Sequence, residues 1–137
     1  MEYQEPKPTI LVVDDNAGVA ESLAMVLRQS GYMVVTASSA EHALELASGI
    51  AIDLAAIDVQ LPGMDGIRAA VELCKQLPKC KILLISGNAG TGELLERALK
   101  EGIDYPILAK PIPPEQLLST VRALLSGTPT RSSSEER

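Results

Sequence analysis

The chain lacks tryptophan and phenylalanine, and its 137 residues include only three tyrosines, two cysteines and one histidine. Cys74 and Cys80 flank Pro78, and His42 lies far from both in the sequence. Structural zinc sites use closely spaced Cys and His ligands, so this sequence offers no such site. We interpret both cysteines as buried or unreactive thiols that stay reduced. The lack of tryptophan also excludes tryptophan quenching as a probe of metal binding.

Basic residues are also few, with 12 Lys and Arg against 18 Asp and Glu, a net charge of −6 and a pI near 4.8. Nucleic acids and anionic membranes attract basic patches, so neither is expected as a partner. No hydrophobic run approaches membrane-spanning length, and the start "MEYQEPKP" does not resemble a secretion signal. We therefore expect a cytoplasmic protein whose partner is a cation or another protein.

The length fits one domain with short tails. We expect an N-terminal extension over residues 1–8, one domain over 9–126 and a tail over 127–137. The tail, "GTPTRSSSEER", has too few apolar residues to offset the entropy of ordering it, so we predict that it is disordered.

Short apolar runs rich in branched residues alternate with helical patterns along the domain. The runs predict strands and the 3.6-residue periodicity between them predicts helices. Strict alternation of this kind favours an α/β fold with a parallel sheet and helices on both faces. Helix starts are expected after Asn16, Ser39 and Asp65 and at Pro114, and stops at Gly31 and Gly102. The expected strands are 9–13, 33–37, 54–57, 81–85 and 107–109, and the last two helices lie around 94–99 and 117–125.

Polar residues follow four of these strands: Asp14 and Asp15, then Asp58, Ser86 and Lys110. In a parallel sheet the carboxyl ends of the strands meet at one edge, where ligands bind. Each residue alone has a structural explanation, as a helix cap, a turn or a solvated charge. Together, however, three carboxylates repel one another unless a cation or Lys110 offsets their charge.

All of these candidate ligands are oxygens, which favours Mg²⁺, with Mn²⁺ as a substitute, over zinc or copper. A carboxylate nucleophile beside a hard cation and a lysine suits phosphoryl transfer through an acyl phosphate.

The blocks "VVDDN", "LAAIDVQLPGMDG", "LLISG" and "AKP" occur in that order. Together they resemble the signature of response regulator receiver domains of two-component signalling, and the resemblance covers residues 9 to 126. It implies a flavodoxin-like (βα)5 doubly wound fold, with a five-stranded parallel sheet in strand order 2-1-3-4-5. Among receivers, the chain is most similar to single-domain regulators of the chemotaxis type.

The resemblance also implies roles at the acidic edge. Asp58 would accept a phosphoryl group from a phosphohistidine on a sensor histidine kinase or a histidine phosphotransfer protein, or from acetyl phosphate. Asp14, Asp15, Asp58 and the backbone carbonyl of Gln60 would hold Mg²⁺.

Further family roles fall on the fourth and fifth strands. Lys110 would pair with one phosphoryl oxygen and Ser86 with another. The bond between Lys110 and Pro111 resembles the cis peptide of the family.

Other positions match the family less closely. The switch aromatic of receivers lies three residues before the lysine, where this chain has Ile107. Tyr105 either substitutes for that aromatic or only packs. Gln60 and Asn88 match positions that tune loss of the phosphoryl group, and amides are not strong general bases.

We interpret the chain as a signalling receiver that changes its contacts with a downstream protein, and not as an enzyme acting on other substrates. Three alternatives remain open. The chain could be a receiver-like interaction module that is never phosphorylated, a fragment of a longer regulator, or a Mg²⁺-dependent phosphohydrolase. The D-x-D loop typical of such hydrolases is absent at Asp58, which is followed by Val59 and Gln60.

Overall fold

Five parallel strands form one sheet in the order β2-β1-β3-β4-β5, as predicted. The computed structural model describes residues 7–87, 96, 99–100, 102 and 105–127. Each expected strand is present, and two of them extend one residue further than expected, to Asp58 and Ser86. The strands are β1 Thr9–Val13, β2 Met33–Ala37, β3 Leu54–Asp58, β4 Lys81–Ser86 and β5 Ile107–Ala109.

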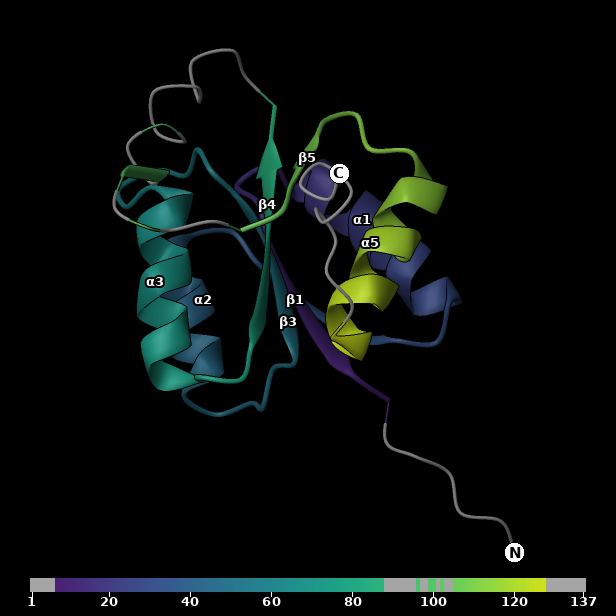
Figure 1. The fold of residues 1–137 in the computed structure, drawn as a ribbon, viewed down its shortest axis with the longest axis horizontal. Coiled ribbons are helices and arrows are strands. Elements are labelled where there is room, and N and C mark those ends of the chain that lie inside the picture. The colour runs from purple at the N-terminus through teal and green to yellow at the C-terminus, as the bar shows by residue number, and fades with distance from the viewer. Residues whose placement is uncertain (1–6, 88–95, 97–98, 101, 103–104, 128–137) are drawn as a thin grey trace, which may run out of the picture.

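Helices cover both faces of the sheet (Figure 1), with α1 and α5 on one side and α2 and α3 on the other. The helix expected around residues 94–99 lies largely outside the described residues. Most of the two predicted tails, residues 1–6 and 128–137, lies outside them as well. The helices are α1 Ala17–Gln29, α2 Ala40–Ala47, α3 Gly66–Gln76 and α5 Pro114–Ser126.

The hydrophobic core is divided by the sheet into two layers. Alternate residues of a strand point to opposite faces, so Ile10 and Val12 pack under α1 and α5, while Leu11 and Val13 pack under α2 and α3. Helices cover both layers, which explains why the central strands are apolar throughout and do not alternate.

Three helices begin directly after the residues predicted to cap them. In each case the side-chain oxygen of the cap accepts a hydrogen bond from the backbone N–H of the third helical residue. The bonds are Val19 N to Asn16 Oδ1 at 3.1 Å, His42 N to Ser39 Oγ at 3.1 Å and Arg68 N to Asp65 Oδ1 at 2.7 Å.

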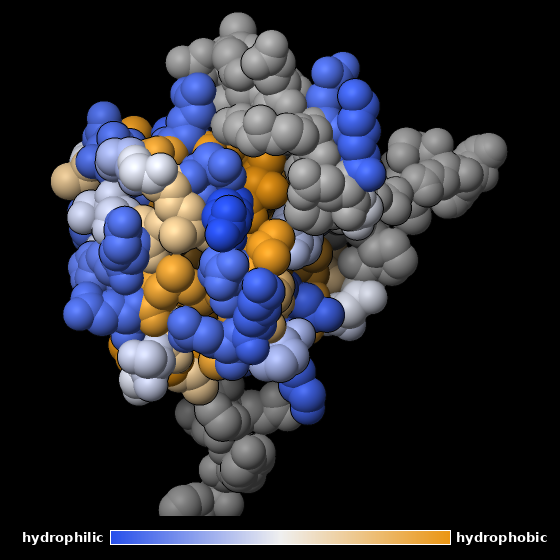
Figure 2. Space-filling view, turned by 90° about the vertical axis from the view of Figure 1, so that its left-hand side faces the viewer, coloured by the Kyte–Doolittle hydropathy of each residue, from blue (hydrophilic) through white to orange (hydrophobic). Residues whose placement is uncertain are grey.

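The edge strand β5 begins directly after Pro106, whose carbonyl accepts a hydrogen bond from Leu84 N at 2.8 Å. Proline is tolerated there because an edge strand has one unpaired side. On the side of the sheet that α2 and α3 cover, Figure 2 shows mainly hydrophilic side chains, with smaller hydrophobic areas between them. Within the described part of the chain, every helix is too short or too polar to cross a bilayer.

Candidate functional site: an acidic cluster at the carboxyl edge of the sheet

Three aspartates meet where β1 and β3 end. Asp14 and Asp15 directly follow β1, and Asp58 is the last residue of β3. One carboxylate oxygen from each lies within 4.8 Å of the others. Asp14 is 1% exposed and Asp58 6%, whereas Asp15 is exposed to solvent. The register of the sheet thus gathers the three carboxylates predicted to form a site.

The two buried carboxylates are oriented by the backbone that follows them. Asn16 N donates to Oδ1 of Asp14 at 2.9 Å, and Gln60 N donates to Oδ1 of Asp58 at 2.8 Å. Both bonds span two residues, the local pattern that aspartate forms at turns. With Oδ1 held by these bonds, the Oδ2 atoms of Asp14 and Asp58 both point toward one position between the ends of the strands.

The ammonium of Lys110 occupies that point. Its Nζ lies 2.7 Å from Asp58 Oδ2 and 2.8 Å from Asp14 Oδ2. Burial alone would lower the pKa of Lys110, but its interactions with Asp14 and Asp58 outweigh this effect and raise the pKa above its usual value. Lys110 therefore carries a full positive charge at neutral pH.

The backbone around Lys110 holds it at the end of β5. Its N–H donates to the carbonyl of Ser86 at 2.9 Å, and the peptide bond to Pro111 is cis, as predicted. The end of β4, where Ser86 lies, is therefore joined directly to Lys110.

The donors of the cluster fit a hard divalent cation. One ammonium offsets one of three carboxylate charges, so two negative charges remain when all three aspartates are ionised. The buried Oδ2 of Asp14 also accepts no hydrogen bond from the described residues, although Lys110 lies beside it. Such a set of oxygens matches Mg²⁺ or Mn²⁺ and offers no soft ligand.

Gln60 borders the cluster. It lines a cavity of about 420 Å³ together with Asp15, Asp58 and Lys110. Asn88 lies outside the described residues. Of the two residues predicted to tune loss of the phosphoryl group, the structure therefore describes only Gln60, which lies beside the carboxylates.

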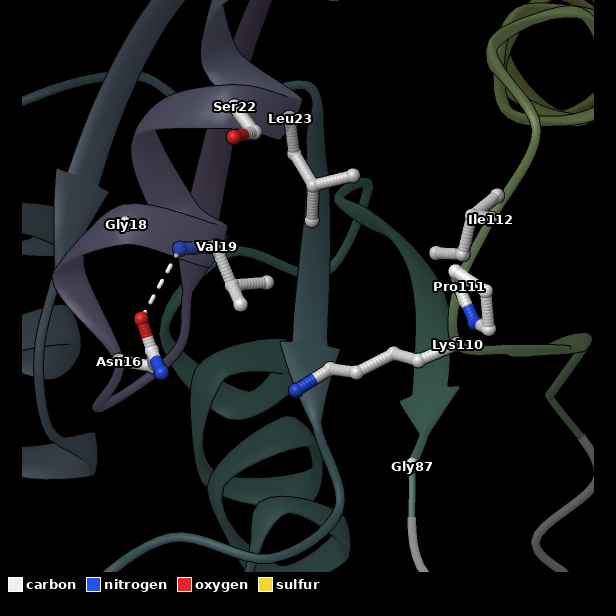
Figure 3. A pocket seen from close by; sticks show the side chains of 9 residues that line it. All are labelled: Asn16, Gly18, Val19, Ser22, Leu23, Gly87, Lys110, Pro111 and Ile112. Atoms are coloured by element: carbon white, nitrogen blue, oxygen red, sulfur yellow. Dashed lines mark hydrogen bonds between the residues drawn. The ribbon is translucent and has the colours of Figure 1, made fainter.

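A second cavity, of about 760 Å³, opens on the other side of Lys110. Figure 3 shows Asn16, Val19 and Leu23 of the α1 region facing Lys110 and Ile112 across it. No pattern in the sequence predicts this cavity, because it forms between segments about ninety residues apart.

Gly87 contributes to both cavities; it ends the signature block "LLISG", but the block does not show that it lines the site. A Cβ at this position would lie 2.8 Å from Cδ of Lys110. The glycine therefore lets the lysine side chain lie close over the end of β4.

Tyr105 lies away from the acidic cluster. Ile107 pairs with Leu84, so Tyr105 lies level with Ile82, four residues before Ser86 along β4. Its hydroxyl is 3.8 Å from Sγ of Cys74. Tyr105 packs against the core layer under α2 and α3, and Ile107, at the switch position, is 42% exposed.

Comparison with known proteins agrees with this geometry. The family model described as "Response regulator receiver domain" matches residues 10–122. The chain therefore belongs to the response regulator receiver domains, the signalling domains of two-component systems. Receiver domains of these systems interact with histidine kinases.

Particular relatives extend the comparison. The alkaline phosphatase synthesis transcriptional regulatory protein PhoP of Bacillus subtilis is 38% identical over 120 residues, covering 85% of this chain and 48% of PhoP. The signal receiver domain of an HD domain-containing protein from Pseudomonas fluorescens Pf-5 is 30% identical with a TM-score of 0.81, covering 89% of this chain and 97% of that one. This chain spans half or less of the length of the first curated relatives that it matches.

Proposed function

We propose that this chain is a phosphoacceptor. In a Mg²⁺-dependent reaction, Asp58 takes a phosphoryl group from a phosphohistidine of a sensor histidine kinase or a histidine phosphotransfer protein. The observation that carries the proposal is the buried Asp58 carboxylate, 2.7 Å from the Lys110 ammonium and clustered with Asp14 and Asp15. Phosphorylation would then change the contacts of the chain with a downstream protein.

In the transfer, a carboxylate oxygen of Asp58 attacks phosphorus, an O–P bond forms, and the N–P bond to the imidazole breaks. The electron pair of that bond stays on the imidazole nitrogen. Lys110 offsets the charge of one phosphoryl oxygen, and the hydroxyl of Ser86 donates to another. Asp14, Asp15, Asp58 and the Gln60 carbonyl would hold Mg²⁺, which neutralises phosphoryl oxygens when bound.

One solved relative supports this chemistry. A response regulator from Burkholderia pseudomallei, crystallised with a phosphorylated aspartic acid, a calcium ion and citrate, is 30% identical with a TM-score of 0.73. The match covers 88% of this chain and 70% of that one. A hard cation together with an aspartyl phosphate in a protein of this fold is compatible with the oxygen donors found here.

The test is incubation with Mg²⁺ and acetyl phosphate, followed by intact-mass measurement. The wild-type chain should gain a single phosphoryl group, whereas Asp58→Ala and a wild-type sample with the metal chelated should gain none. If the wild-type chain neither gains a phosphoryl group nor binds beryllium fluoride with Mg²⁺, the proposal is wrong. That result would favour a receiver-like module that binds its partner without phosphorylation.

We further propose that Gln60 and Asn88 set the lifetime of the phosphorylated state. Gln60 lines the cavity that Asp58 also lines, so its side chain can admit or orient water there. Substituting either residue with Ala should change the rate at which the label is lost. Unchanged decay in both variants would refute this role.

We also propose that residues 9–126 act as one receiver unit and that Ser86 and β5 carry the phosphorylation signal outward. Ile107 at the switch position is exposed, so that signal would not require burial of an aromatic side chain there. The packing of Tyr105 beside Cys74 favours a structural role for the tyrosine over a switching role.

A further inference from the structure

The start of α3 is in direct contact with the backbone of the proposed phosphoacceptor. Gly66, the first residue of α3, donates its N–H to the carbonyl of Val59 at 2.9 Å. A Cβ at Gly66 would lie 2.7 Å from Cα of Val59 and 2.8 Å from the carbonyl carbon of Asp58, and closer still to the carbonyl oxygen of Asp58. Real Cβ atoms do not approach other atoms within 3.0 Å, so any side chain here forces a shift of backbone.

The backbone that follows Asp58 is also held from the side of β4. Val59 N donates to the carbonyl of Ile85 on β4 at 2.9 Å. The peptide that follows Asp58 is therefore held between β4 and the first turn of α3. A shift forced at Gly66 would have to move the helix or the residues that carry the acceptor.

The loop between Asp58 and Gly66 also contains Gln60. The Gln60 N–H orients the Asp58 carboxylate, and the Gln60 carbonyl is a proposed metal ligand. Asp65 fixes the beginning of α3 by accepting the N–H of Arg68 at 2.7 Å. The helix start thus sets the position of two groups that belong to the site.

We infer that Gly66 is a positioning residue for Asp58. Because it lacks a Cβ, the first turn of α3 closes onto the Asp58 backbone and holds the carboxylate against Lys110. The inference rests on the proposed function for its kinetic readout, whereas its spectroscopic readout is independent of that function.

The test compares Gly66→Ala with Gly49→Ala in the full chain. A Cβ added at Gly49 would have no atom within 4 Å, and Gly49 has no positive φ, so it is a matched control. In ¹H–¹⁵N spectra without metal or donor, Gly66→Ala should shift the Gln60 amide clearly. The Asn16 amide, which reports on Asp14, should shift less, and Gly49→Ala should move neither amide.

The second readout is the rate of phosphorylation by acetyl phosphate with Mg²⁺, measured per folded molecule. Displacements near 1 Å can cost about a hundredfold in rate, so Gly66→Ala should be slower by about tenfold or more. Gly49→Ala should react at the wild-type rate.

If Gly66→Ala lowers the thermal midpoint but leaves the Gln60 amide shift and the phosphorylation rate at their wild-type values, the inference is overturned. That result would show that Gly66 has a structural role only. If Gly66→Ala does not fold, Asp65→Ala loosens the same helix start without adding bulk. It should shift the Gln60 amide, whereas the cap variant Ser39→Ala on α2 should not, and an unmoved amide would overturn the inference. A wild-type chain that takes no phosphoryl group refutes the proposed function, but the amide comparison still tests Gly66.

Discussion

A single ammonium lies between two buried carboxylates at the centre of the site. Asp14 and Asp58 both lie within 2.8 Å of Lys110, and their other oxygens accept backbone hydrogen bonds. Asp15 adds a third negative charge at the solvent side of the cluster. The site therefore favours binding of a cation at the expense of stability in its absence.

Replacing Asp15 with Asn should reveal this cost. Loss of one repelling charge should raise the thermal midpoint of the metal-free protein by roughly 2–4 °C. The same variant should lose most of the stabilisation that Mg²⁺ gives the wild type. Differential scanning calorimetry with and without Mg²⁺ measures both effects. Glu45→Gln removes an exposed carboxylate on α2, outside the cluster, and should change neither value. A lower midpoint for metal-free Asp15→Asn would contradict this account.

Cys80 gives a prediction about pH. Burial, followed by the neighbouring Cys74 and Asp53, raises the pKa of the Cys80 thiol from 9.0 to about 12. At pH 8, alkylation of Cys80 by iodoacetamide should therefore be roughly a thousandfold slower in the folded chain than in urea. Peptide mass mapping over time measures this ratio, and equal rates would show that the thiol is not shielded.

The same shift affects stability in alkaline solution. Below pH 9 the thiol is protonated in both states, but between pH 9 and about 12 only the unfolded state loses the proton. The free energy of unfolding should therefore fall across that window. Tyr105, whose pKa burial and Cys74 raise from 10.0 to about 12, adds to the fall above pH 10. In Cys80→Ala the free energy of unfolding should fall less between pH 9 and 10 than in the wild type. Urea denaturation at each pH measures this difference.

Helix α1 contributes one face to the core and another to solvent. Leu27 is 0% exposed and packs in the layer shared with α5, while Met25 on the same helix is 50% exposed. The cap at Asn16 and the αL residue Gly31 limit the helix at its two ends. Packing of the buried face therefore accounts for most of what α1 adds to stability.

Two alanine variants on α1 test whether its stability comes from the buried face and not from the exposed face. Leu27→Ala should lower the free energy of unfolding by about 2–5 kcal/mol, because it removes buried contacts and leaves a cavity. Met25→Ala should change it by no more than about 0.5 kcal/mol, as is usual for an exposed position. Chemical denaturation measures both, and similar losses would mean that the outer face of α1 is also packed.

Across the whole molecule, the sequence predicted the features that depend on short stretches of chain, namely the strands and the helix starts. Apolar runs predicted the strands, and Asn16, Ser39 and Asp65 predicted the helix starts, because caps and strand periodicity are local properties. The grouping of Asp14, Asp58 and Lys110 followed from the rule that parallel strands end at one edge. The resemblance to receivers supplied the strand order and the cis peptide.

Close packing contacts of individual residues could not be predicted in this way. The closeness of Gly66 to Asp58 and of Gly87 to Lys110 depends on how a helix and a strand end pack, and a glycine in a sequence does not show what it approaches. The direction of Tyr105 likewise depends on the register of β5 against β4, which places its hydroxyl beside Cys74. A one-residue change of register would have turned that side chain to the other face.

The most direct test of the central claim is to locate the phosphoryl group in the wild-type chain. Borohydride reduces an aspartyl phosphate to homoserine, which peptide mass spectrometry identifies by position. After treatment with acetyl phosphate and Mg²⁺, we predict homoserine at position 58 alone, and none when the donor or the metal is omitted. Homoserine at position 14 or 15, or a mass gain without any homoserine, would contradict the assignment of Asp58 as the acceptor.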